Sequence, residues 1–128
     1  MVWKIDYQED SQIVELSFSG RISGAELKEA AAARIEFGND KGIRKYLIDA
    51  TEMLAPKSTI FDVLEIPAKV YSDKLMDRSS NIAVVQPTDP DSQWIAEFYG
   101  NASVMRGWKS EIFSDRESAI AWLQALDR

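Results

Sequence analysis

The sequence alternates between two kinds of apolar pattern, and this alternation restricts the fold more than any other feature. Segments in which apolar residues recur at every second position, or form a short continuous run, predict strands, and a recurrence every three or four positions predicts helices. Along the 128 residues the order is strand, strand, helix, strand, helix, strand, helix, strand, helix. With short connections, this ββαβαβαβα order favours one α/β domain over residues 1–128.

Five segments have strand patterns. Residues 3–7 and 13–18 alternate apolar and polar positions across a turn-like connection, which predicts an antiparallel hairpin with one solvated face. Residues 46–48 and 82–85 are continuous apolar runs typical of strands covered on both faces, and residues 108–113 form the last strand. We therefore expect a mixed, mainly parallel five-stranded sheet with one antiparallel edge and four helices.

The first helical pattern covers residues 24–37. Ser23 and Glu26 have the spacing of a capping box at its start, and Gly38 is expected to end it. Its inner stripe contains Leu27, Ala30, Ala31, Arg34 and Ile35.

The second helical pattern follows Ser58 and Thr59. Its apolar stripe consists of Phe61, Leu64, Ala68, Tyr71 and Leu75. Pro67 lies inside this stripe, where it removes a backbone hydrogen bond, so we expect a kink or break near Ile66.

Two further helices complete the pattern. One begins in the segment 89–92 and ends before Gly107, and the other begins with a second capping box formed by Ser114 and Glu117. The inner residues expected for the earlier helix are Trp94, Ile95, Phe98, Tyr99, Ala102 and Met105, and those for the later helix are Ala119, Ile120, Leu123 and Leu126.

Composition excludes several classes of protein. The longest apolar runs are a few residues, far short of the roughly 20 that cross a bilayer, so the chain is not membrane-spanning. The first residues alternate in polarity and lack the apolar region of a signal peptide, and cysteine is absent, so we expect a cytoplasmic protein. The net charge of −6, without a cluster of Lys or Arg, disfavours nucleic acid as a partner.

The chemistry of common active sites is missing. Without histidine or cysteine there is no Ser-His-Asp triad, no cysteine nucleophile and no ordinary zinc site, and the standard phosphate-binding glycine motifs are absent. The remaining acids near strand ends fit turn and cap roles better than acid–base or metal-binding roles. We therefore expect no catalytic residue, no metal, no cofactor and no enzymatic activity.

Ligands and partner proteins that bind to a parallel α/β sheet usually do so at the rim formed by the carboxyl ends of its strands. Here that rim covers residues 49–58, 86–92 and 114–115, and it is rich in acids, which suits a partner protein that presents Lys or Arg. Aromatic side chains form a second candidate region, which would hold an apolar small molecule between helices, form a partner or homodimer interface, or simply fill the core. Its residues are Phe61, Tyr71, Trp94, Phe98 and Tyr99.

The order of strands and helices, together with two regions of the sequence, resembles that of a known family. The segment Leu-Ile-Asp-Ala-Thr at 47–51, with an aspartate that closes the central strand, and the C-terminal segments 111–113 and 118–123 resemble the SpoIIAA-like (STAS/SEC14-like) bacterial proteins. The resemblance spans nearly the whole chain, and its motifs are mostly core positions. It implies the SpoIIAA-like, STAS-type fold.

The resemblance also implies function. The family includes anti-sigma-factor antagonists, which bind a partner kinase and are switched by phosphorylation of a serine at the start of the helix after the central strand. The family segment is of Asp-Ser-Ser-Gly type, and this chain has Pro-Lys-Ser-Thr-Ile at 56–60 instead, so Ser58 matches that serine in approximate position. The candidate residues of the partner or phospho-switch rim are Asp49, Thr51, Ser58 and Thr59.

One hypothesis is that the chain is a non-enzymatic regulatory or protein-interaction module that responds to phosphorylation. The other, from the SEC14-like similarity, is a carrier of a small molecule or lipid in an apolar pocket between helices.

Overall fold

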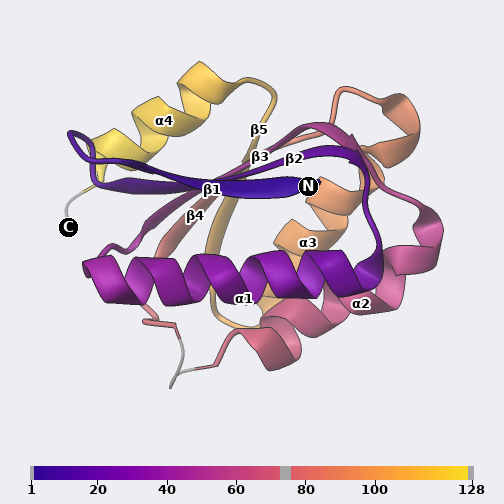
Figure 1. The fold of residues 1–128 in the computed structure, drawn as a ribbon, viewed down its shortest axis with the longest axis horizontal. Coiled ribbons are helices and arrows are strands. Elements are labelled where there is room, and N and C mark those ends of the chain that lie inside the picture. The colour runs from indigo at the N-terminus through magenta and orange to yellow at the C-terminus, as the bar shows by residue number, and fades with distance from the viewer. Residues whose placement is uncertain (1, 73–75, 127–128) are drawn as a thin grey trace.

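A five-stranded sheet lies at the centre of the computed structural model, which describes residues 2–72 and 76–126 (Figure 1). The strands lie in chain order, β1-β2-β3-β4-β5. Strand β1 pairs antiparallel with β2, and all later pairs are parallel, which confirms the expected mixed sheet. The strands are β1 (Trp3–Gln8), β2 (Ile13–Arg21), β3 (Lys45–Leu54), β4 (Asn81–Val85) and β5 (Lys109–Phe113).

Helices cover both faces of the sheet (Figure 1). The crossovers from β2 through β5 all step in the same direction across the sheet, so right-handed connections place α1, α2 and α3 on one face. Helix α4 follows the last strand and packs on the opposite face, against β3, β4 and β5. The helices are α1 (Gly24–Lys41), α2 (Ile60–Glu65), α3 (Trp94–Met105) and α4 (Arg116–Ala125), with short helical segments η1 (Lys57–Thr59), η2 (Ile66–Val70) and η3 (Pro90–Ser92).

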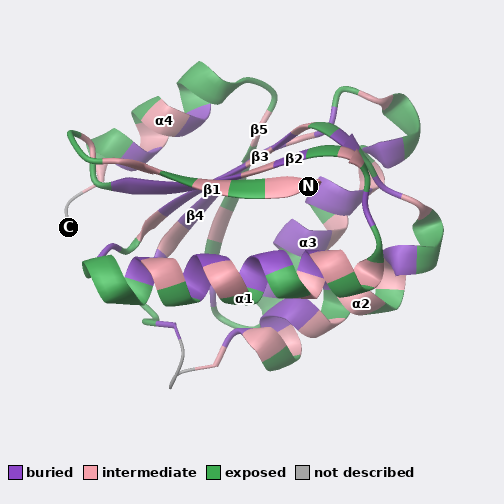
Figure 2. Cartoon of the chain, viewed as in Figure 1, coloured by how far each residue is buried: buried purple, intermediate pink, exposed green. Residues whose placement is uncertain are grey.

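The two faces of the sheet have separate cores, and Figure 2 shows buried positions alternating with exposed ones along α1. The larger core fills the space between the sheet and α1 to α3. The smaller core lies under α4 and contains Ile13, Leu47, Ala83, Val85, Ala119 and Leu123. Strand β3 serves both cores, because Tyr46 and Ile48 face the larger one and Leu47 the smaller.

The central strand is longer than its apolar run predicts. Strand β3 continues to Leu54, so Asp49 lies within the strand and does not close it. The extension pairs with β2 beyond a β-bulge, at which β3 has one residue more than β2 between Asp49 and Glu52. Pairing with β2 therefore sets the end of β3, and the local sequence pattern does not reveal this pairing.

The expected start of α1 is confirmed, and the expected end is wrong. Ser23 Oγ accepts a hydrogen bond from the Glu26 amide at 3.1 Å, and Glu26 Oε1 accepts one from the Ser23 amide at 2.9 Å. The helix passes through Gly38 and ends at Gly42, which has a left-handed φ of 69°. Gly38 has another role: a Cβ there would come within 2.7 Å of Cζ in the Tyr46 ring.

The expected break at Pro67 is confirmed, but the buried stripe is not the one expected. Helix α2 changes into the π-helical segment η2, in which the Tyr71 amide donates to the Ile66 carbonyl at 2.8 Å. The wider turn changes the face that meets the core, so Phe61 is 76% exposed and Leu64 is 39% exposed. The buried positions are Val63, Ile66, Pro67 and Tyr71, and Leu75 lies outside the described residues.

Two smaller expectations near the C-terminus are corrected. Asp115 caps α4, because its Oδ1 accepts from the Ser118 amide at 2.7 Å, so Ser114 and Glu117 do not form a capping box. Met105, expected to face inward, is the last residue of α3 and is 86% exposed.

Candidate functional site

The rim residues lie in two different places. Asp49 and Thr51 are on β3 and line an open groove of about 870 Å³, together with residues of β1 and β2 and Arg116 of α4. Ser58 and Thr59 lie on η1 and line a separate hollow of about 320 Å³. The structure therefore brings together each pair of rim residues but does not form one site from all four.

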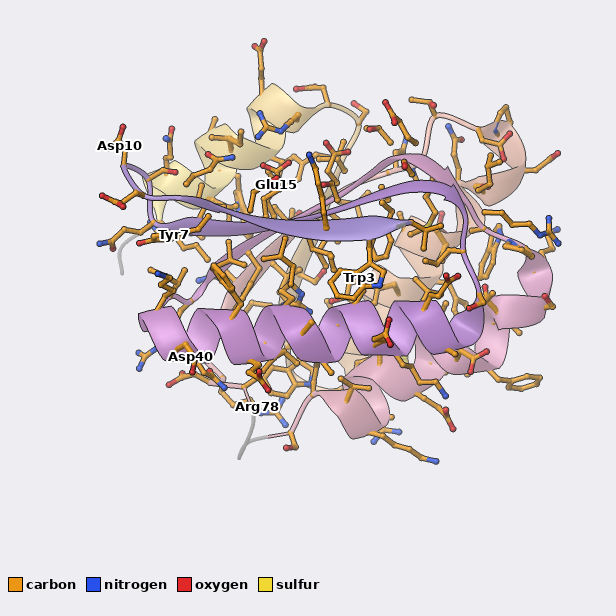
Figure 3. All side chains as sticks on the ribbon, viewed as in Figure 1. Trp3, Tyr7, Asp10, Glu15, Asp40 and Arg78 are labelled. Carbon is orange, nitrogen blue, oxygen red and sulfur yellow. The ribbon has the colours of Figure 1, made fainter. Side chains whose placement is uncertain are left out.

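The groove exists because α4 covers only part of its face of the sheet. Its floor carries an ion pair, in which Arg116 donates to both oxygens of Glu15 at 2.6 and 3.2 Å. Gln8 Nε2 also donates to Glu15, at 2.8 Å. Figure 3 shows Glu15 on the α4 side of the sheet, where it is only 8% exposed.

The charges of the groove are largely paired. The hydrogen bonds to Glu15 raise the pKa of the Arg116 guanidinium, which lies 3.9 Å from Asp49 Oδ2. Asp49 Oδ1 accepts from the amide and hydroxyl of Thr51, at 3.0 and 2.7 Å. Because these groups bond to one another, the groove is a stabilised polar surface more than a reactive one.

The two hydroxyls of η1 differ in accessibility. Thr59 is 3% exposed, and its Oγ1 donates to the Pro56 carbonyl at 2.7 Å. Ser58 is exposed, and its hollow is also lined by Arg21 and Asp62. Ser58 is therefore open to solvent, whereas Thr59 is buried with its hydroxyl bonded to the backbone.

The five aromatic candidates also separate. Phe61 faces solvent. Trp94 and Phe98 are half-buried, pack edge to face with ring centroids 6.1 Å apart, and line a surface hollow of about 410 Å³. Tyr71 and Tyr99 lie in the larger core, with their hydroxyl oxygens 2.5 Å apart.

A small cavity lies inside the larger core, beside those two tyrosines. Its volume is about 50 Å³, and residues of the sheet, α1, α2, η2 and α3 line it. Arg34 of α1 is among the lining residues and is 0% exposed.

Contacts with tyrosines hold the Arg34 side chain. Its guanidinium carbon lies 4.7 Å from the centre of the Tyr46 ring and 5.1 Å from that of Tyr71, and Nη2 donates to the Tyr71 hydroxyl. Nε and Nη1 have no hydrogen-bond partner among the described residues. Burial raises the pKa of Tyr99 well above its ordinary value, so its hydroxyl keeps its proton.

The helical pattern of residues 24–37 places Arg34 on the inner stripe but does not indicate a function for it. The signal was present, because a residue that is always charged rarely occupies a buried apolar stripe. Glu15 was overlooked in the same way: its strand position predicts a solvated face, and Arg116, distant in sequence, covers it.

Two other kinds of feature are absent from the described residues. No group of three or more His, Cys, Asp or Glu side chains in that part of the chain is arranged to hold a metal ion. None of its helices combines the length and the apolar character needed to cross a bilayer.

Comparisons with solved structures identify the fold, whereas the other comparisons find no match. No protein-family model matches the sequence, and no curated protein matches it significantly. An uncharacterized DUF3478-family protein with a SpoIIAA-like fold, from Shewanella loihica PV-4, superposes with a TM-score of 0.57 at 20% identity, over 94% of this chain and 91% of that one. The anti-sigma factor antagonist SpoIIAA in its unphosphorylated form superposes with a TM-score of 0.56 at 13% identity, over 97% and 99%. The chain therefore has the SpoIIAA-like fold that its sequence resemblance implies.

Proposed function

We propose that the chain is a cytoplasmic, non-enzymatic regulatory domain of the STAS type, which binds a partner protein under the control of phosphorylation at Ser58. The exposure of Ser58 on η1 carries this proposal. It is supported by the full-length likeness to SpoIIAA, an anti-sigma factor antagonist described in an unphosphorylated form.

The surroundings of Ser58 suit a charge-based switch. A phosphate adds about −1.5 to −2 charges at neutral pH and strong hydrogen-bond acceptors. It would enter a hollow lined by both Arg21 and Asp62, so one neighbour attracts it and the other repels it. Thr59 is a poor second acceptor because its hydroxyl is buried and bonded to Pro56.

An apolar surface adjoins Ser58 and gives a partner something to bind. Phe61 and Leu64 are exposed on α2, and Ile60 lines the hollow that Trp94 and Phe98 form on α3. Aromatic residues of this kind are enriched at protein interfaces. Because phosphate at Ser58 would lie beside this surface, it would hinder an apolar partner.

The test compares partner binding by two variants at Ser58. Tagged Ser58→Ala and Ser58→Glu chains would be used to purify bound proteins from the native cells, with quantification by mass spectrometry. We expect a partner that Ser58→Ala retains and that Ser58→Glu loses by about tenfold or more, which corresponds to about 1.4 kcal/mol. Ser79→Ala, a change at an exposed serine outside the rim, is the control. Identical binding by all three variants would contradict the proposal.

A second copy of the chain is an alternative occupant of the same apolar surface. Sedimentation of the purified chain would then show a dimer that Phe61→Ala weakens, because the Phe61 ring is largely exposed. If the chain is a monomer at all concentrations, the partner is a different protein.

The interior cavity favours a second function, the binding of a small molecule. Its volume of about 50 Å³ is a third of the roughly 150 Å³ that holds benzene in an engineered protein cavity. This cavity therefore suits a ligand of a few heavy atoms and is too small for a lipid chain.

A further inference from the structure

The larger core contains a charge that its described surroundings do not neutralise. Arg34 is 0% exposed, and its guanidinium keeps its charge because it does not lose a proton in proteins. No carboxylate among residues 2–72 and 76–126 forms an ion pair with it. The Nε proton and both Nη1 protons lack an acceptor within the same part of the chain.

The tyrosines around Arg34 compensate only part of this charge. The rings of Tyr46 and Tyr71 lie within cation–π distance, and the Tyr71 hydroxyl accepts from Nη2. These groups are neutral, whereas a buried cation that lacks a counter-ion pays a large desolvation penalty. An anion beside Arg34 would remove that penalty and satisfy the N–H groups that lack an acceptor in the described part of the chain.

The cavity that Arg34 lines has room for such an anion. Its volume of about 50 Å³ corresponds to roughly three to five water-sized positions. Of the described residues that line it, only Arg34, Tyr71 and Tyr99 carry N–H or O–H donors in their side chains. The remaining lining residues are apolar, and they include Leu16, Leu27, Ile48, Val63 and Ile95.

We propose that this cavity binds a short-chain monocarboxylate of about three to five heavy atoms, with its carboxylate on Arg34 and its carbon atoms against the apolar wall. The planar guanidinium matches the geometry of a carboxylate. A single cation balances one negative charge, so a divalent anion would leave an unpaired charge in the core. An apolar wall disfavours a halide, which has no carbon atoms to place there.

The first test is titration of the intact chain with carboxylates at constant ionic strength. Acetate and propionate should raise the melting temperature in a saturable way, because a ligand that binds the folded state stabilises it. The ¹⁵N–¹H signal of Arg34 Nε should move with the same dependence on concentration. Acetamide, the uncharged analogue of acetate, and hexanoate, which is too large, should produce neither effect.

Either of two results would overturn the proposal. One is an unchanged Arg34 Nε signal with acetate and propionate. The other is an equal response to sodium chloride, because the site would then not select a carboxylate.

A pair of variants links the effect to the buried charge. Arg34→Met keeps an unbranched side chain but removes the charge, so its melting temperature should not respond to acetate. Arg106→Met, at an exposed arginine, should keep the full response. An acetate response that survives Arg34→Met would contradict the proposal, and the Nε signal of the unaltered chain decides the matter if that variant does not fold. The result of these acetate titrations does not depend on Ser58, because the role of Ser58 is tested separately, by partner binding.

Discussion

Replacement of Gly38 by alanine tests the packing between α1 and β3. A Cβ at this position would lie 2.7 Å from both Cε1 and Cζ of Tyr46, closer than real Cβ contacts allow. Tyr46 is 1% exposed and lies against the Arg34 guanidinium, so its ring cannot turn out into solvent. The backbone of α1 would have to shift away from the sheet.

Two effects of opposite sign determine the magnitude. Alanine favours a helix over glycine by about 1 kcal/mol. Overpacking of a rigid core costs about 1–3 kcal/mol, and an overlap with a confined aromatic ring belongs in the upper part of that range. We therefore expect Gly38→Ala to lower the free energy of unfolding by about 1–2 kcal/mol, and the melting temperature by roughly 3–10 °C.

Urea denaturation followed by circular dichroism would measure this loss. A double-mutant cycle with Tyr46→Leu identifies its cause, because Gly38→Ala should be neutral or stabilising once the ring is absent. If Gly38→Ala stabilised the protein with Tyr46 in place, as at an ordinary exposed helix position, the close contact between Gly38 and the Tyr46 ring would be wrong.

Three other changes have defined outcomes. Arg116→Ala should lower the free energy of unfolding by about 1–3 kcal/mol in chemical denaturation, because it leaves the mostly buried Glu15 without its charged donor, and Glu15→Gln in the same background should restore part of the loss. Lys28→Met should raise the pKa of Glu65 in an NMR titration, because the hydrogen bond from Lys28 at 2.8 Å holds that pKa below its ordinary value of 4.5. A lowered folded-state pKa stabilises the protein above the unfolded-state value, and this contribution is lost as the pH falls through the folded-state pKa. The stability difference between the native chain and Lys28→Met should therefore shrink in acid, and a constant difference would contradict the assignment. Ser23→Ala should cost about 1 kcal/mol through loss of the α1 cap, and an unchanged melting temperature would show that the cap contributes nothing.

The sequence predicted the order of strands and helices because their periodicity is a local property. The hairpin, the covered strands β3 and β4 and the break at Pro67 all follow from patterns of a few residues. Tertiary contacts decided the rest. The pairing of β2 with the end of β3 places Asp49 within a strand, and the π-helical turn of η2 moves Phe61 to the surface.

The candidate site was less predictable than the fold. Ser58 and Thr59 are neighbours with similar chemistry, and only the folded η1 segment buries one hydroxyl and exposes the other. The helical stripe placed Arg34 in the interior. Whether a buried cation has an acidic partner depends on residues far away in sequence, so the lack of acceptors for its Nε and Nη1 among the described residues could not be predicted.

Phosphopeptide mass spectrometry on the protein isolated from its own cells is the most direct test of regulation at Ser58. We expect phosphate on Ser58 in a fraction that changes with growth conditions, and an unmodified Thr59, because its hydroxyl is buried. Ser58 that stays unmodified under all conditions, or phosphate on Thr59 in its place, would contradict the proposed switch.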